Sequence, residues 1–292
     1  MNWLNPDDST DGVETENSGG GNGRMFGKIG GAGAVIIVII SLILGKNPLQ
    51  VLGFVNNVLP DQQQTVTTGT VTNAGADNDS TFTIRVYNSA NKVWSGIFAD
   101  QFHQTYTKPR LVLFNGTTQT ACGGASASSG PFYCPGDGKV YIDLSFFQQL
   151  SQQFRAPGDL AKAYVVAHEM GHHIQRLLGV TDKVDAARQR MSDADYNKLS
   201  VKLELQADFY AGLWAHYAQQ EGIISLTDAD IDQALAAANA VGDDNLQKQA
   251  QGYAVPESFT HGTSAERIYW FKKGYTTGDF SQGDTFDDAS LN

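Results

Sequence analysis

The chain has 292 residues, of which 41% are hydrophobic and 17% charged, enough to bury one sizeable core with a small appendage beside it. Its formal net charge of −11 excludes proteins that bind nucleic acid or anionic lipid through a basic surface. We therefore expect one main folded domain and no nucleic-acid partner.

Three segments are expected to precede the folded domain. Residues 1–28 are acidic and rich in glycine, and they predict a disordered tail because such a composition buries little apolar surface. Residues 29–45 form a charge-free apolar run (IGGAGAVIIVIISLILG) that is about long enough to span the hydrocarbon of a bilayer. Residues 46–80 are rich in Gln, Thr, Asn and Gly, which is typical of a flexible linker.

The apolar run 29–45 predicts a retained signal anchor. A cleaved signal peptide would have a cleavage site of small residues after the run, and LGKNP at 44–48 is a poor one. Arg24 and Lys28 precede the run and Lys46 follows it, so the positive-inside rule predicts a single-pass cell-membrane protein with a cytoplasmic N-terminus and an external domain. The alternative is a buried core helix in a cytosolic protein.

The folded domain is predicted over residues 81–280, with a tail at 281–292. Apolar residues recur near helical spacing over 81–104, and the next apolar segment, RLVLF at 110–114, has the composition of a buried strand.

A turn cluster, PGDG at 135–138, divides two further short segments. Residues 131–134 and 139–143 flank it and predict a β-hairpin, and everything after Leu144 is predicted to be helical. Cys122 and Cys134 are expected to form a disulfide if the domain lies in an oxidising compartment, and to be free thiols in the cytosol.

A motif that binds zinc lies on a predicted helix over 159–179, with Asp159 as its N-cap and Gly179 as its terminator. In the segment HEMGH, His168 and His172 are four residues apart and lie on one helix face, so both imidazoles can reach one tetrahedral ion. Glu169 lies close enough to contact a water on that ion.

The neighbouring His173 points about 100° from His172 and is predicted to face away from the ion. His216, further along the chain, is predicted to have a packing or hydrogen-bonding role. Neither is expected to be a ligand.

A second acidic motif, ELQAD, follows on a helix predicted from near Ser192 to Gly222. Its spacing lets Glu204 complete the metal shell while Asp208, one turn later, accepts a hydrogen bond from a ligand imidazole. Two histidines and one glutamate leave a fourth position open to water, as in a catalytic zinc site. Availability of other divalent metals leaves the identity of the ion open.

The HExxH and ExxxD motifs together resemble the gluzincin metallopeptidases. That resemblance implies that Glu204 is the third ligand and that Asp208 supports a ligand histidine. More narrowly, four segments of this chain resemble the bacterial family of neutral zinc metallopeptidases, which has one N-terminal membrane helix: ACGGASASSGPFYCPGDGKVYIDLSFF, AHEMGHHIQ, ELQADFYAGLWAHY and FTHGTSAERIYWFKKGY.

The last of these segments contains a capping box, Thr263 with Glu266, that predicts a final helix through Gly274. Its arrangement is similar to the His-Pro-x-x-x-x-Arg segment of membrane metallopeptidases related to the HtpX heat-shock protease, with Gly262 in place of the proline. The resemblance implies that His261 stabilises the oxyanion.

Other residues of the same region have competing interpretations. Tyr253 and Tyr269 are alternatives to His261 as the oxyanion donor. Arg267 is predicted to be an ion-pair partner and not a substrate clamp. The segment from Cys122 to Cys134 either lines the cleft as a sheet edge that pairs with substrate, or is a stapled surface loop.

These observations predict an α+β, zincin-like domain, with a small sheet packed on the active-site helix and a mostly helical C-terminal half. The predicted function is a membrane-anchored peptidase that hydrolyses peptide or protein substrates through a zinc-activated water, with Glu169 as general base. The alternative is a membrane-tethered binding or scaffold protein that keeps the fold without activity. The sequence predicts no particular oligomeric state.

Overall fold

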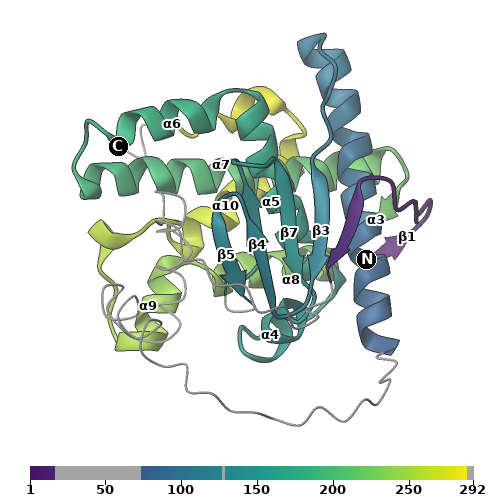
Figure 1. The fold of residues 1–292 in the computed structure, drawn as a ribbon, viewed down its shortest axis with the longest axis horizontal. Coiled ribbons are helices and arrows are strands. Elements are labelled where there is room, and N and C mark those ends of the chain that lie inside the picture. Colours follow the sequence, from purple (N-terminus) through teal and green to yellow (C-terminus); the bar gives the residue numbers. More distant parts are fainter. Residues whose placement is uncertain (17–73, 127–128, 288–292) are drawn as a thin grey trace.

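The computed structural model describes residues 1–16, 74–126 and 129–287. They form an α+β fold in which a small sheet lies against a larger group of helices (Figure 1). This agrees with the predicted fold class and is consistent with a zincin-like domain. Within the described ranges, none of the helices is long and apolar enough to cross a membrane.

The main sheet has four strands in the order β2-β3-β7-β6. β2 (Val13–Glu16), β3 (Arg110–Phe114) and β7 (Lys139–Asp143) are parallel, and β6 (Phe132–Cys134) is antiparallel to β7. The predictions of a strand at 110–114 and of a hairpin around PGDG are therefore confirmed.

Side chains alternate across this sheet, as the two-residue period of a strand requires. Leu111 and Leu113 of β3 face the helices, and Val112 and Phe114 face a separate small cluster on the other side. β4 (Thr117–Thr120) and β5 (Gly123–Ser126) form a hairpin that contributes Ala125 to this cluster. Both faces of the sheet are consequently covered.

Eleven helical elements complete the described part of the domain. They are α3 (Ala74–Ile97), the π-helical turn η1 (Phe98–Phe102), α4 (Phe146–Gln152), α5 (Asp159–Leu177), α6 (Val180–Arg188), α7 (Asp193–Gln220), α8 (Asp228–Ala240), α9 (Asp243–Gln251), α10 (Ser264–Thr277) and the short 3-10 turns η3 (Pro256–Ser258) and η4 (Phe280–Gly283). The described strands also include β1 (Asn2–Trp3) and β8 (Ile224–Ser225), which pair with each other.

Helices α5, α7 and α10 form the centre of the domain, with α5 also against the sheet (Figure 1). Gly212 of α7 and Gly274 of α10 let these two helices approach closely. A Cβ at Gly212 would overlap the carbonyl oxygen of Phe271, and one at Gly274 would overlap that of Phe209. This close contact fixes α7, which carries one candidate ligand, against α10.

Helix α5 begins differently from its prediction. Gly158, with φ of 116°, occupies the N-cap position, and Asp159 is the first helical residue. The predicted N-cap role of Asp159 is wrong, because the backbone needs a positive φ that glycine adopts most readily. Gln233 of α8 accepts a hydrogen bond from the Leu160 N–H (3.2 Å) in place of a local cap.

The prediction of a disordered N-terminal tail is wrong for residues 1–16. β2 pairs with β3 over four residues, and Glu14 forms ion pairs with Arg110 (2.6 Å) and Lys139 (2.8 Å) of the neighbouring strands. The acidic composition predicted disorder, but the acidic residues of this segment form ion pairs with basic residues that lie far away in the sequence.

Both predicted ends of the folded domain differ from the structure. Helix α3 begins at Ala74, before the predicted domain start at 81, and Thr285 is buried within the predicted C-terminal tail. The anchor predicted at 29–45 and most of the predicted linker lie outside the described residues, so membrane attachment stays a prediction from the sequence.

Candidate metal centre

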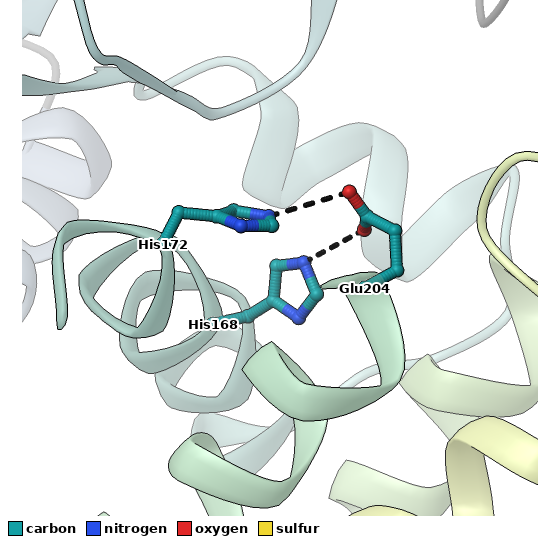
Figure 2. A group of neighbouring side chains, drawn as sticks. All are labelled: His168, His172 and Glu204. Atoms are coloured by element: carbon teal, nitrogen blue, oxygen red, sulfur yellow. Dashed lines mark hydrogen bonds and ion pairs between the residues drawn. The ribbon is translucent and has the colours of Figure 1, made fainter. Parts of the chain in front are cut away.

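Three predicted ligands converge between α5 and α7. His168 and His172 come from α5 and Glu204 from α7, and Figure 2 shows both imidazoles pointing toward the carboxylate. Nε2 of His168 lies 3.1 Å from one carboxylate oxygen, and Nε2 of His172 lies 3.4 Å from the other. One ligand atom from each residue falls within 4.8 Å of the other two.

This spacing fits a zinc ion. Zn–N and Zn–O bonds of about 2.0–2.1 Å in a tetrahedron place ligand atoms about 3.3 Å apart. Burial alone would raise the pKa of Glu204, but the imidazoles of His172 and His168 hold it well below its ordinary value. The carboxylate is therefore ionised and ready to bind a cation.

Asp208 lies beneath His168 and is completely buried (0% exposed). It accepts hydrogen bonds from His168 Nδ1 (2.8 Å), from the Tyr164 hydroxyl (2.5 Å) and from Arg267 Nε and Nη2 (2.8 and 2.9 Å). Burial opposes ionisation of Asp208, yet Arg267 and His168 lower its pKa. The structure thus places Asp208 against the ligand histidine, and Arg267 is an ion-pair partner, as predicted.

His172 has a different partner on its outer nitrogen. Its Nδ1 lies 2.8 Å from Oε1 of Gln175, which is completely buried. Gln175 was not among the predicted site residues. The signal was present, because Gln175 follows His172 by three residues and so shares its helix face.

Glu169 is buried on α5 beside the ligands and close to β6. Burial raises its pKa to about 7, although the neighbouring His168 and a backbone hydrogen bond from Tyr133 oppose the rise. A carboxyl group with a pKa near neutrality suits a group that both accepts and donates a proton.

His261 comes from the loop before α10 and is 9% exposed. Asp243, at the start of α9, fixes this loop by accepting hydrogen bonds from the backbone N–H groups of Thr260, His261 and Gly262 (2.7, 2.6 and 3.1 Å). The other oxygen of Asp243 lies 3.1 Å from His261 Nδ1.

His261 and Glu204 each shift the pKa of the other, which indicates that the imidazole lies near this carboxylate. His261 contributes to lowering the pKa of Glu204, and burial lowers the pKa of His261 less than Asp243 and Glu204 raise it. Tyr253 and Tyr269, the competing candidates, are 63% and 54% exposed. The structure therefore favours His261 over both tyrosines for a place beside the metal ligands.

Gly262 explains one departure from the related sequence pattern. Its φ is +89°, a conformation closed to the proline found at this position in the HtpX-related segment, because proline holds φ near −65°. The backbone of this chain therefore enters α10 by a different turn.

Comparison with known protein families agrees with this geometry. A model described as "Putative neutral zinc metallopeptidase" matches residues 1–286. The chain belongs to this family. An "Uncharacterized protein YpfJ" from Escherichia coli (strain K12) is 41% identical over 289 residues, covering 98% of this chain and 99% of the relative.

A second relative comes from a mycobacterium. "Uncharacterized protein Rv2575" from Mycobacterium tuberculosis (strain ATCC 25618 / H37Rv) is 45% identical over 229 residues, covering 74% of this chain and 75% of its own length. No solved structure matched the chain. The zinc metallopeptidase family and the His-His-Glu cluster agree in fitting a zinc site.

His173 and His216 make their hydrogen bonds to groups outside the ligand cluster. His173 contacts the Thr107 carbonyl through Nε2 (2.7 Å) and the Tyr133 hydroxyl through Nδ1 (3.1 Å), so the prediction that it faces away is confirmed. His216 Nδ1 contacts the Tyr275 carbonyl (2.8 Å) at the far end of α10, which confirms its hydrogen-bonding role.

Cys122 and Cys134 are joined by a disulfide, which ties the end of β6 to the turn between β4 and β5. Residue 133 of that strand provides the backbone hydrogen bond to Glu169. The disulfide therefore joins the strand next to Glu169 to the turn of the β4–β5 hairpin.

Proposed function

We propose that this family member is a zinc-dependent peptidase that hydrolyses peptide bonds with Glu169 as general base. One observation carries the proposal: His168, His172 and Glu204 converge at distances that fit zinc, with the buried Glu169 next to them on α5. Membership of a family described by its zinc metallopeptidase character supports it.

The zinc ion, Glu169 and His261 would each have a separate role in peptide hydrolysis. A bound zinc ion would supply a Lewis acid that activates water and polarises the scissile carbonyl. Glu169 would take a proton from the water and return it to the leaving amine, which its pKa of about 7 allows near neutral pH. As an imidazolium, His261 would donate one hydrogen bond from Nδ1 to Asp243 and another from Nε2 to the developing oxyanion, and Asp243 favours this charged form because it raises the pKa of His261.

Peptide or protein substrates would lie in extended form beside β6. This strand stands at the end of the sheet order and next to Glu169. A strand in that position can receive an extended chain through main-chain hydrogen bonds, which would carry the scissile bond past the general base.

Digestion of a peptide library tests the proposal. The wild-type chain with zinc should cleave peptides, and Glu169→Gln should lower the rate about 10²–10⁴-fold while zinc content stays unchanged. Glu257→Gln, which alters an exposed acid on η3, is the matched control and should keep full activity. Full activity in Glu169→Gln contradicts the proposal, and a zinc-loaded wild type that cleaves nothing indicates a binding or scaffold protein.

A further inference from the structure

We propose that Gln175 is a positioning residue that sets the tautomer and orientation of His172, an inference that rests on the proposed metal centre. Gln175 is completely buried on α5, one turn after His172. Both ends of its side-chain amide have hydrogen-bond partners. These partners fix the orientation of the amide, and the amide in turn fixes the tautomer of His172.

The first restriction comes from a backbone carbonyl. Nε2 of Gln175 lies 2.6 Å from the Leu203 oxygen of α7. A carbonyl oxygen only accepts hydrogen bonds, so the amide nitrogen must face α7 and the amide oxygen must face His172. Oε1 is then 2.8 Å from His172 Nδ1, which must carry the proton.

This arrangement leaves the other imidazole nitrogen available. With Nδ1 protonated, Nε2 of neutral His172 keeps its lone pair, and Nε2 is the atom that lies 3.4 Å from Glu204 Oε1. An imidazole in this tautomer and orientation is ready to bind zinc without rearrangement.

A second glutamine holds the first in place. Gln175 Nε2 also contacts Gln206 Oε1 (3.2 Å), and Gln206 Nε2 donates to the Gly283 carbonyl (2.9 Å). Another backbone acceptor therefore fixes the orientation of the second amide. Leu203 directly precedes Glu204, so Gln175 also joins the helix of the third ligand to that of the second.

Zinc affinity of the full-length chain, measured by competition with a chromogenic chelator, tests this role. Gln175→Met removes the acceptor at similar length and should weaken zinc binding about 10–100-fold, the usual effect of losing a group that orients a ligand. Gln247→Met is the matched control, because Gln247 is also buried and bonded at both amide ends, to Ser258 Oγ and the Val255 N–H. The control should keep wild-type affinity.

Each outcome has a separate meaning. A wild type that binds zinc, together with an equally tight Gln175→Met variant, overturns the positioning role and leaves the proposed function intact. A folded wild type that binds no zinc overturns the proposed function itself.

Nitrogen-15 NMR of the imidazoles in the wild-type chain tests the inference even if Gln175→Met does not fold. The structure predicts a proton on Nδ1 of neutral His172 and none on Nε2. A proton on Nε2 instead would overturn the inference.

The main sheet carries a second, independent inference about the N-terminal residues. We infer that residues 1–16 and the domain from residue 74 onward lie on the same side of any membrane. β2 precedes the apolar run 29–45 and β3 follows it, yet the two strands pair in register from Val13↔Leu111 to Glu16↔Phe114.

Residues 1–16 also contact other elements of the domain that follow residue 74. Arg85 of α3 binds Asp8 through Nε and Nη2 (2.5 and 3.0 Å), and Asn88 Nδ2 donates to the backbone oxygens of Asp7 and Ser9 (2.9 and 2.8 Å). The Leu4 N–H donates to the Ile223 carbonyl (2.9 Å).

These contacts are incompatible with a membrane between their partners. Paired strands lie about 4.8 Å apart, whereas the hydrocarbon of a bilayer is about 30 Å thick. An odd number of crossings between residues 16 and 74 would separate β2 from β3. The inference therefore replaces the predicted topology, in which the N-terminus is cytoplasmic and the domain external.

Cysteine labelling of the full chain in intact cells tests the topology. Thr10→Cys and Met191→Cys place thiols at exposed positions in the two regions, and the native cysteines are joined to each other. A membrane-impermeant maleimide should label both variants, or neither until the cells are lysed. A permeant maleimide should label both in every case. Labelling of only one variant by the impermeant reagent overturns the inference.

Discussion

The two candidate histidine ligands are held by opposite kinds of chemistry. His168 contacts a charged network in which the buried Asp208 is bound by Arg267 and Tyr164. His172 contacts the neutral amide of Gln175 and, through it, backbone carbonyls. One side of the centre is thus built from compensated charges and the other from oriented dipoles.

The two sides of the centre should therefore contribute differently to stability and to ligand geometry. A buried charge that loses its partner is costly, so the His168 side should dominate the stability of the fold. A neutral amide costs less free energy to bury than a charge does. Its hydrogen bonds orient the imidazole, so the His172 side should affect ligand geometry more than folding. Substitutions on the two sides should separate these contributions.

Asp208→Ala should have the largest effect on stability. It leaves the buried guanidinium of Arg267 unpaired, and breaking a buried pair in this way costs about 3–5 kcal/mol. Urea unfolding of the metal-free chain measures the loss. Asp182→Ala, which removes an exposed partner of Arg176, is the control and should change stability by under about 1 kcal/mol. Equal losses of unfolding free energy in the two variants would contradict the claim that the charged network around His168 dominates stability.

His261→Ala tests the proposed oxyanion donor. Removing an oxyanion donor should lower kcat about 10²–10³-fold, with little change in zinc content. Tyr253→Phe removes the hydroxyl of an exposed alternative and should have no such effect. Loss of activity in the tyrosine variant alone would reverse the assignment.

Asp243→Asn adds a pH dependence to the same assignment. Asp243 raises the pKa of His261, so the variant should lower that pKa. A donor that must be protonated loses activity as pH rises through its pKa, and the alkaline limb of kcat should therefore move to lower pH. An unchanged limb would show that the charge of His261 does not control activity.

Gln175→Met should destabilise the metal-free chain less than Asp208→Ala. It removes the acceptor of the His172 Nδ1–H and the donor to the Leu203 carbonyl, and a polar group left unsatisfied in the interior costs about 1–3 kcal/mol. Urea unfolding provides the comparison. A loss as large as that of Asp208→Ala would remove the distinction between the two sides.

Glu14→Gln should have the smallest effect, because its ion pairs with Arg110 and Lys139 are only partly buried. Pairs of this kind contribute about 0.2–1 kcal/mol, and raised salt should reduce the difference from wild type. Urea unfolding at two salt concentrations measures it. A loss of several kcal/mol would place part of the stabilising charge at the sheet edge, far from the centre.

Helical periodicity allowed much of the centre to be predicted. His168 and His172 share a face because they lie four residues apart, and the same rule relates Glu204 to Asp208. The capping box at Thr263 and Glu266 was also predictable, although the helix continues beyond Gly274 to Thr277.

Other contacts depend on tertiary structure and left no local signal. Asp243 reaches the His261 loop only because α9 packs beside it, and Tyr164 and Arg267 meet at Asp208 from two different helices. The N-terminal strand was mistaken for a disordered tail because Glu14 looks unpaired until β3 and β7 place Arg110 and Lys139 beside it.

Metal content of the purified chain, compared with Glu204→Ala under chelator-free conditions, tests the central claim most directly. We expect about one zinc per wild-type chain, and a lost or strongly weakened ion in the variant, because Glu204 completes the ligand set of the two α5 histidines. A folded wild-type chain without metal, or a variant that holds zinc as tightly as wild type, would contradict it.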